Sequence, residues 1–287
     1  MNILVYQHIY KNGGSTVWKR YKNNAVSTLL RFPSFELPTK CIRSTNGEEY
    51  DAPFKKKMNP PPQFIHGRLH PGLLEKEFDW NPIYTTTLRE PVDRIMSAYN
   101  FFISDIYHKW GNEIDVDFKL WFLNSFRIIP TEYQAQYEWF IIHTNENPIS
   151  YDDALVATYR RFKFREWQRH QERRNPTESI PSEEQAIALE EKHCEYAFNT
   201  MKKRYKHVFF LDQVDRLEKI DKLFQDYDIP VTPDVNVRNE NNSNDAFGPM
   251  KRNAVQFTDL STEYQEFAYK MLKYEIQFYN NCKDEYT

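Results

Sequence analysis

The sequence predicts an α/β fold in which a central parallel sheet is flanked by helices. Three observations lead to this prediction: apolar runs of strand length lie at residues 3–10, 83–88 and 207–212, and each precedes a turn and a segment of helical character. Strands that alternate with helices pair in parallel, because the helix carries the chain back across the sheet. With 287 residues, the chain can bury a full core, either as one domain with insertions or as two domains.

The first strand–helix unit contains a glycine turn suited to an anion. Residues 3–10 are apolar and aromatic, as strands are, and the turn after them holds two of the seven glycines, Gly13 and Gly14. Ser15 and Thr16 follow, and either can cap a helix. Glycine lets the backbone approach a phosphate, and the first helical N–H groups point toward it. The turn is therefore a candidate phosphate loop, although a plain glycine turn after an edge strand has the same pattern.

Lys11 lies before the two glycines of this turn. In the common nucleoside triphosphate loop the lysine follows the last glycine, and the pattern Gly-x-x-x-x-Gly-Lys occurs nowhere in the chain. The position of the lysine therefore disfavours an ATPase or a GTPase.

A helix is expected over residues 15–30, and the proline-rich residues 32–62 are expected to be irregular. Two histidines and an arginine then surround a glycine. In an extended segment, His66, Arg68 and His70 would project on one face. A histidine that titrates near neutrality could act there as a base beside a fixed cation. A surface turn with incidental histidines is the alternative.

The second strand–helix unit ends its strand on an arginine. Residues 83–88 have strand character, and Pro91 and Asp93 suit the first turn of a helix. Arg89 ends the strand at its carboxyl edge, where open α/β sheets bind ligands. Ser97 falls two turns into the helix, near the same edge. Both side chains are therefore candidate ligand contacts.

The middle of the chain is predicted to be helical. Residues 118–126 and 133–142 combine dense aromatics with polar residues, and residues 151–171 form a basic, aromatic helix. That helix could attract an acidic acceptor, or it could be a solvated amphipathic face. Residues 182–204 return to helix behind a Ser-Glu-Glu-Gln capping box.

The last third supplies another strand–helix unit. Residues 207–212 read as a buried strand of parallel type, and residues 217–227 read as the helix after it. Residues 235–244 are polar and expected to be irregular, and residues 259–280 form a final amphipathic helix rich in Tyr and Phe.

Composition and cysteine spacing argue against several classes. The net charge of −3 does not suggest a general nucleic-acid-binding surface. Cys41, Cys194 and Cys282 are far apart and odd in number, which favours a reduced, intracellular setting and supplies no metal cluster. With no secretory leader and no run of about 20 apolar residues, a complete chain is expected to be soluble and cytoplasmic, without a membrane span. A chain trimmed of an anchor would instead be luminal.

Two of these segments together resemble sulfotransferases that use 3′-phosphoadenosine 5′-phosphosulfate (PAPS). The order His-x-x-Lys-x-Gly-Gly-Ser-Thr at residues 8–16 resembles their 5′-phosphosulfate loop. The order Leu-Arg-Glu-Pro-Val-Asp-Arg-x-x-Ser-x-Tyr at residues 88–99 resembles their 3′-phosphate loop and is much more specific. The match is sharp over residues 6–21 and 64–102, and it is similar to the carbohydrate branch that includes heparan-sulfate 2-O-sulfotransferases and bacterial relatives.

The resemblance implies a three-layer, P-loop-like sulfotransferase fold with helical insertions. It implies one domain over residues 1–287, with a divergent, acceptor-side helical insertion at about residues 103–204. The implied activity is in-line transfer of a sulfuryl group from PAPS to a hydroxyl, or secondarily an amine, of a carbohydrate or small natural product. The product would be 3′-phosphoadenosine 5′-phosphate (PAP), and no metal is required. Oligomeric state is not predicted.

The resemblance also assigns roles to individual residues. Lys11 would stabilise charge on the bridging oxygen at the transferred group. The 5′-phosphosulfate would be held by Asn12, Gly13, Gly14, Ser15 and Thr16. The 3′-phosphate would be bound by Arg89 and Ser97, with Arg238 as a candidate third contact. Guanidinium groups suit that phosphate because they can bind it with two parallel hydrogen bonds.

The catalytic base departs from the pattern of the related enzymes. Their His-Gly-His group reads His66-Gly67-Arg68 here, and arginine cannot act as a base at physiological pH. His66 is therefore the first candidate base and His70 the second, with Arg68 as a substrate contact. A Mg²⁺-dependent nucleotide kinase of related fold and a catalytically silent nucleotide-binding protein remain as alternative functions.

Overall fold

Among the described residues, five parallel strands form the centre of the fold, in the order β2-β3-β1-β4-β5. Their bounds are β1 (Asn2–Gln7), β2 (Leu29–Arg31), β3 (Phe64–Gly67), β4 (Asn81–Leu88) and β5 (Tyr205–Phe210). The computed structural model describes residues 2–9, 11–14, 16–17, 29–31, 64–67, 71, 74–75, 80–110, 117–119, 121–122, 136, 140, 182–229 and 254–287. The α/β class and the parallel sheet expected from the sequence are both present.

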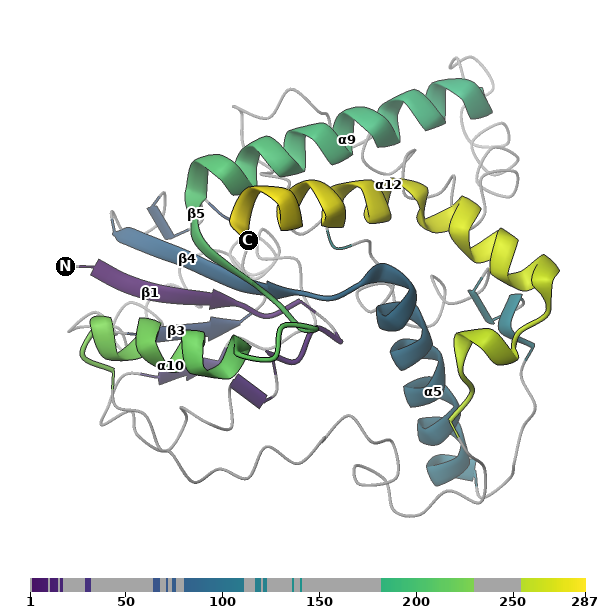
Figure 1. Ribbon diagram of the computed structural model, residues 1–287, viewed down its shortest axis with the longest axis horizontal. Helices are drawn as coiled ribbons and strands as arrows, with labels where there is room; N and C mark the ends of the chain where they lie inside the picture. The colour runs from purple at the N-terminus through teal and green to yellow at the C-terminus, as the bar shows by residue number, and fades with distance from the viewer. Residues whose placement is uncertain are drawn as a thin grey trace, which may run out of the picture.

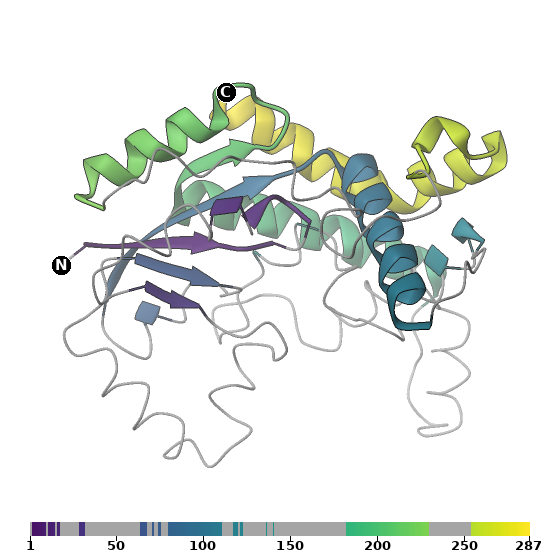
Figure 2. The same ribbon diagram turned by 90° about the horizontal axis from the view of Figure 1, so that it is seen from below.

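In the described part of the chain, four α-helices accompany the sheet. They are α5 (Pro91–Trp110), α9 (Glu183–Arg204), α10 (Arg216–Asp226) and α12 (Thr262–Tyr286), and a short 3₁₀ helix, η2 (Phe257–Asp259), precedes the last of them. Figure 1 shows α10 in front of the sheet, α9 running beside α12, and α5 leaving the end toward which the strands point. Figure 2 shows the same arrangement from below.

The two faces of the sheet bury different sets of side chains. Ile3 and Val5 of β1 belong to a core cluster with residues of α9 and α12. Leu4 and Tyr6, which point to the opposite face, belong to a cluster with residues of α10. Each large apolar side chain buried in this way stabilises the fold by roughly 1.5–3 kcal/mol. The sheet is thus covered on both faces, as parallel sheets usually are.

The helix starts follow local signals that are visible in the sequence. Ser182 Oγ accepts a hydrogen bond from Gln185 N at 3.2 Å, and Gln185 Oε1 accepts one from Ser182 N at 2.7 Å, which completes the predicted capping box. Pro91 is the first residue of α5, as predicted. Helices predicted at residues 182–204, 217–227 and 259–280 are present as α9, α10 and α12.

The predicted helix over residues 15–30 is wrong at its end. Leu29 and Leu30 lie in β2, which pairs in parallel with β3 through the registers Leu29–Phe64 and Leu30–Ile65. Leucine favours helices, but intrinsic helix propensity is a weak effect, and pairing with β3 outweighs it here. The predictions for residues 32–62, 151–171 and 235–244 fall on residues outside those described.

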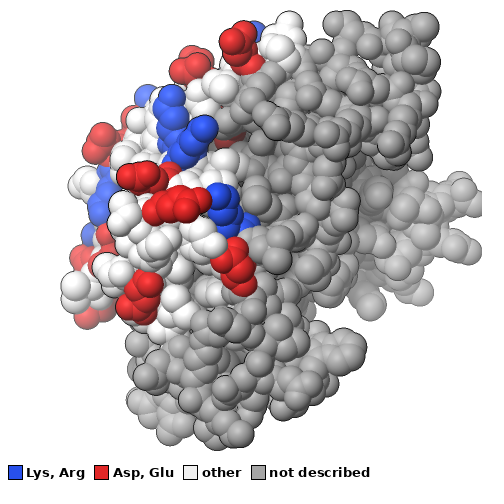
Figure 3. Space-filling model, turned by 90° about the vertical axis from the view of Figure 1, so that its right-hand side faces the viewer, with Lys and Arg blue, Asp and Glu red and all other residues white. Residues whose placement is uncertain are grey.

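Past the carboxyl edge of the sheet, α5 and α12 contribute to a third apolar cluster, which includes Tyr99, Phe118 and Trp121. On that side of the molecule, the described acidic and basic side chains are interspersed (Figure 3). An ion pair of 2.9 Å joins Lys119 and Glu263. Among the described residues, no helix is long and apolar enough to cross a membrane.

Candidate functional site

The strand order places a topological switch point at the carboxyl ends of β1 and β4. These strands are neighbours, but the chain leaves β1 toward β2 on one side of the sheet and leaves β4 toward β5 on the other. Neighbouring strands whose connections diverge leave a crevice at their carboxyl ends, which is where open α/β sheets bind ligands. The strands point toward α5, so this edge faces the start of that helix (Figure 1).

The loop after β1 requires both of its glycines. Gly13 has φ of 76°, and a Cβ there would lie 2.8 Å from both Arg216 Nη1 and Leu211 Cδ1. A Cβ on Gly14 would lie 2.1 Å from His8 Cδ2. The neighbouring Lys11 also has a positive φ, of 62°, which is uncommon for a residue with a side chain. The loop backbone is therefore held in a special conformation with room only for hydrogen at residues 13 and 14.

The loop after β1 is tied to the end of β4. Asn12 Nδ2 donates to Thr87 O at 2.9 Å, and Arg89 Nη1 donates to Lys11 O at 3.2 Å. These hydrogen bonds join segments that are 75 and 78 residues apart in the sequence. The two segments predicted to bind the two ends of one ligand are therefore in contact.

Gln136 bridges the same two segments. Its Oε1 accepts hydrogen bonds from Asn12 Nδ2 at 2.6 Å and from Arg89 N at 2.9 Å, and its Nε2 donates to Arg89 O at 2.7 Å. The residue is fully buried, so unmade hydrogen bonds would be costly there. No local sequence pattern singles out this glutamine.

A buried ion pair contacts Gln136 and helps to hold it in place. Arg94 of α5 donates to both carboxylate oxygens of Glu275 of α12, at 2.8 Å and 3.0 Å. Gln136 N donates to the same carboxylate at 3.3 Å. The two-bond geometry is the strong form of an arginine–carboxylate pair. The Arg94 side chain thus forms a structural ion pair, although it lies within the segment that resembles a 3′-phosphate loop.

The site gathers positive charge from three adjacent strands. Lys11 follows β1 and places its amino group 4.1 Å from the centre of the Phe101 ring. Arg89 follows β4, and burial lowers its pKa. Arg216 follows β5 at the start of α10, and burial lowers its pKa as well. Sequence reasoning missed Arg216, even though its place after a strand parallels that of Arg89.

Glu90 is an acidic side chain at this edge. Burial raises its pKa, and its Oε2 accepts a hydrogen bond from Asp93 N at 2.8 Å. The carboxylate therefore caps the first turn of α5, where the helix dipole favours a negative charge.

His66 lies at the carboxyl end of β3, next to the glycine loop. Its Nε2 lies 2.9 Å from Gly14 O, and because a carbonyl can only accept, Nε2 carries the proton of this hydrogen bond. Its ring is fully buried and stacks on Tyr6 with the centroids 5.5 Å apart, while the His8 ring lies 5.0 Å away. The contacts show that His66 positions the loop, and its role as a base stays a prediction.

Other predicted site residues are placed less completely. Thr16 lies in the first helical turn after the loop and donates its backbone N–H to Gly13 O at 3.2 Å. Ser97 lies two turns into α5 and is half-buried. Four predicted contacts lie outside the described residues: Ser15, Arg68, His70 and Arg238.

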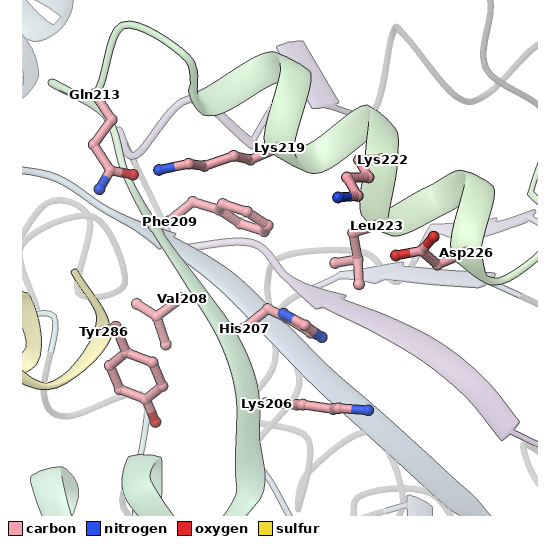
Figure 4. A pocket seen from close by; sticks show the side chains of 10 residues that line it. All are labelled: Lys206, His207, Val208, Phe209, Gln213, Lys219, Lys222, Leu223, Asp226 and Tyr286. Carbon is pink, nitrogen blue, oxygen red and sulfur yellow. The ribbon is translucent and has the colours of Figure 1, made fainter.

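A separate cavity of about 340 Å³ lies between α10 and the edge strand β5 (Figure 4). Lys219 and Lys222 approach it from α10, and Lys206 and His207 approach it from β5. Burial lowers the pKa of His207. This cavity runs along the outer strand, apart from the loop after β1. Within the described ranges, no group of three His, Cys, Asp or Glu side chains has the arrangement of metal ligands.

Comparison with known proteins adds no assignment. No protein-family model matches the chain, and no curated protein matches its sequence. Its function is therefore inferred from its own sequence patterns and geometry.

Proposed function

We propose that the protein is a sulfotransferase that moves the sulfuryl group of PAPS to an acceptor hydroxyl. The observation that carries this proposal is the contact between the loop after β1 and the end of β4, made by Arg89 Nη1 and Lys11 O at 3.2 Å. The first segment resembles a 5′-phosphosulfate loop and the second a 3′-phosphate loop. A donor with anionic groups at both ends of one nucleoside is the ligand class that needs both segments together.

The geometry of the loop supports an anionic ligand independently of the resemblance. Gly13 has a left-handed backbone that suits a tight loop, and a helical turn begins directly after the two glycines. Lys11, Arg89 and Arg216 supply positive charge from three neighbouring strands. The same strand order supports our proposal that the fold is of the P-loop-like sulfotransferase kind.

In the proposed reaction, the chain mainly positions the reactants and stabilises charge, as in phosphoryl transfer. A bond forms between the acceptor oxygen and sulfur, and the bond from sulfur to the 5′-phosphate oxygen breaks, which releases PAP. Lys11 would neutralise the charge that develops on that oxygen. The acceptor proton would pass to a histidine, and His66 and His70 are the candidates. We propose a carbohydrate or a small natural product as the acceptor.

Calorimetric titration tests the donor site directly. PAP, 5′-AMP, ADP and ATP should be titrated with and without Mg²⁺ into the wild type and into Arg89→Gln. We expect PAP to bind more tightly than the other three nucleotides, and to need no metal for binding. Arg89→Gln should lower the affinity for PAP at least about tenfold, as expected for the loss of one charge-assisted contact. Arg204→Gln is the matched control, because this arginine pairs with Glu75 at 2.9 Å just before β5 begins, at the amino edge of the sheet.

Two outcomes would contradict the proposal. A preference for ATP with Mg²⁺ would indicate a kinase. The absence of nucleotide binding would remove the basis for a donor site altogether.

A further inference from the structure

Arg216 is a buried cation without a counter-charge in the described part of the chain. Its residue is 8 % exposed, and its Nη1 makes no hydrogen bond to any described residue. No carboxylate among the described residues pairs with it. The Tyr6 phenol interacts electrostatically with the guanidinium, and burial raises the pKa of that phenol to about 12. That phenol is neutral at physiological pH, so it cannot balance the guanidinium.

Local structure holds Arg216 at the carboxyl edge of the sheet. Leu211 N donates to Leu88 O at 2.8 Å, which continues the pairing of β5 with β4 past the end of the strand. A turn follows in which Arg216 N donates to Gln213 O at 3.3 Å, and α10 begins at Arg216. Arg216 therefore lies directly beside the loop after β1.

The guanidinium lies against the glycine loop itself. Its Nη1 is 2.8 Å from the position that a Cβ on Gly13 would occupy, so the absence of a side chain at Gly13 is what lets the two approach. Lys11 belongs to the same loop, and Arg89 donates a hydrogen bond to that loop. One backbone turn therefore contains Lys11 and is contacted by the side chains of Arg89 and Arg216.

A charge in this position is costly unless an anion balances it. The penalty for taking a charged side chain out of water is several kcal/mol, and a buried charge is normally paired. A bound oxyanion would supply the missing partner, and it would also accept hydrogen bonds from the loop backbone. A lysine or arginine that served only the fold would instead have its carboxylate nearby, as Arg94 has Glu275.

We propose that Arg216 is a binding residue for the anionic 5′ group of the nucleotide donor, held in the glycine loop beside it. The inference rests on the proposed function for the identity of the donor. It concerns a residue outside both segments that carry the sulfotransferase resemblance. Arg216 binds the 5′ end, whereas Arg89 binds the 3′-phosphate.

The test compares two ligands that differ only in the 5′ group. PAP and adenosine 3′-phosphate are titrated by calorimetry into the wild type and Arg216→Gln. We expect Arg216→Gln to weaken PAP binding about 10- to 100-fold, as for the loss of one charged hydrogen-bond donor. Binding of adenosine 3′-phosphate should change less than about twofold. Lys219→Gln is the matched control, because it removes an exposed cation from the same helix and should leave both affinities unchanged.

Thermal unfolding of the ligand-free protein separates a binding role from a structural one. Removing an unbalanced buried charge should leave the melting temperature of Arg216→Gln equal to or above that of the wild type. A melting temperature lowered by several degrees would show that the arginine holds the fold together, and it would overturn the inference.

The remaining outcomes separate the inference from the proposed function. If the wild type binds PAP and Arg216→Gln binds it equally well, the inference is wrong and the proposed function stands. If the wild type binds no PAP, the proposed function fails, and sodium pyrophosphate becomes the probe. Pyrophosphate should then raise the melting temperature of the wild type but not that of Arg216→Gln. Equal effects on both proteins would refute an anion site at Arg216.

Discussion

The buried ion pair between Arg94 and Glu275 should dominate the stability of the region behind the site. Both side chains are only 1 % exposed, and their closest N–O distance is 2.8 Å. The pair Lys119–Glu263 has nearly the same distance, 2.9 Å, but its side chains are 38 % and 72 % exposed. The two pairs therefore have similar closest distances and differ in burial and in the number of hydrogen bonds.

Burial decides the size of the expected effect. Glu275→Gln leaves the Arg94 guanidinium charged and buried without its partner, and removing one partner of such a pair costs about 3–5 kcal/mol. Glu263→Gln removes an exposed pair, which is worth about 0–1 kcal/mol because water and salt screen it. Glu275→Gln should also weaken PAP binding, because Gln136 N donates to this carboxylate and Gln136 holds the two loops.

Urea unfolding followed by tryptophan fluorescence and circular dichroism would measure both free energies. A double variant, Arg94→Met with Glu275→Leu, removes both charges at once and should be more stable than Glu275→Gln. It should still fall short of the wild type, because Gln136 N loses its acceptor at a cost of about 1–3 kcal/mol. Equal losses for Glu275→Gln and Glu263→Gln would refute the reasoning from burial.

Three further predictions concern the loop and the sheet edge. Gly13→Ala should lower the free energy of unfolding, measured with urea, for two reasons. The left-handed backbone costs about 1–2 kcal/mol with a side chain, and the overlap of the new Cβ with Leu211 Cδ1 costs about 1–3 kcal/mol. An unchanged free energy of unfolding would contradict the loop geometry. Lys11→Met should abolish sulfuryl transfer in a PAPS turnover assay while circular dichroism stays unchanged, and near-normal turnover would exclude its proposed role. Burial raises the pKa of Asp212, but the hydrogen bond and the charge of Lys283 outweigh burial, so the net pKa is lowered. The pair therefore stabilises the fold above about pH 4, which is the pKa of an unfolded aspartate. This contribution is lost as the pH falls through the pKa of Asp212 in the folded protein. Asp212→Asn should therefore cost at most about 1 kcal/mol at pH 7, and this difference should vanish in unfolding titrations near pH 2; a constant difference would count against the pair.

Local features of the chain were predictable from the sequence alone. The Ser182 capping box and Pro91 at the start of α5 act within one helical turn, so neighbouring residues contain all the information they need. Apolar runs followed by helices likewise predicted the parallel sheet. The glycines after β1 and the arginine after β4 were predicted as candidate ligand contacts because the carboxyl edge of such a sheet is where loops converge.

Only the tertiary structure decided how those segments meet and what supports them. Leu29 and Leu30 became a strand because β3 lies beside them, and Gln136 joined Asn12 across 124 residues of sequence. Arg216 reached Gly13 because β5 and β1 are separated only by β4 in the sheet. Such contacts depend on the order and register of strands that are distant in the chain. Hydrogen bonds and buried charges between distant segments leave no periodic pattern in the residues on either side, so the sequence determines them only through the complete fold.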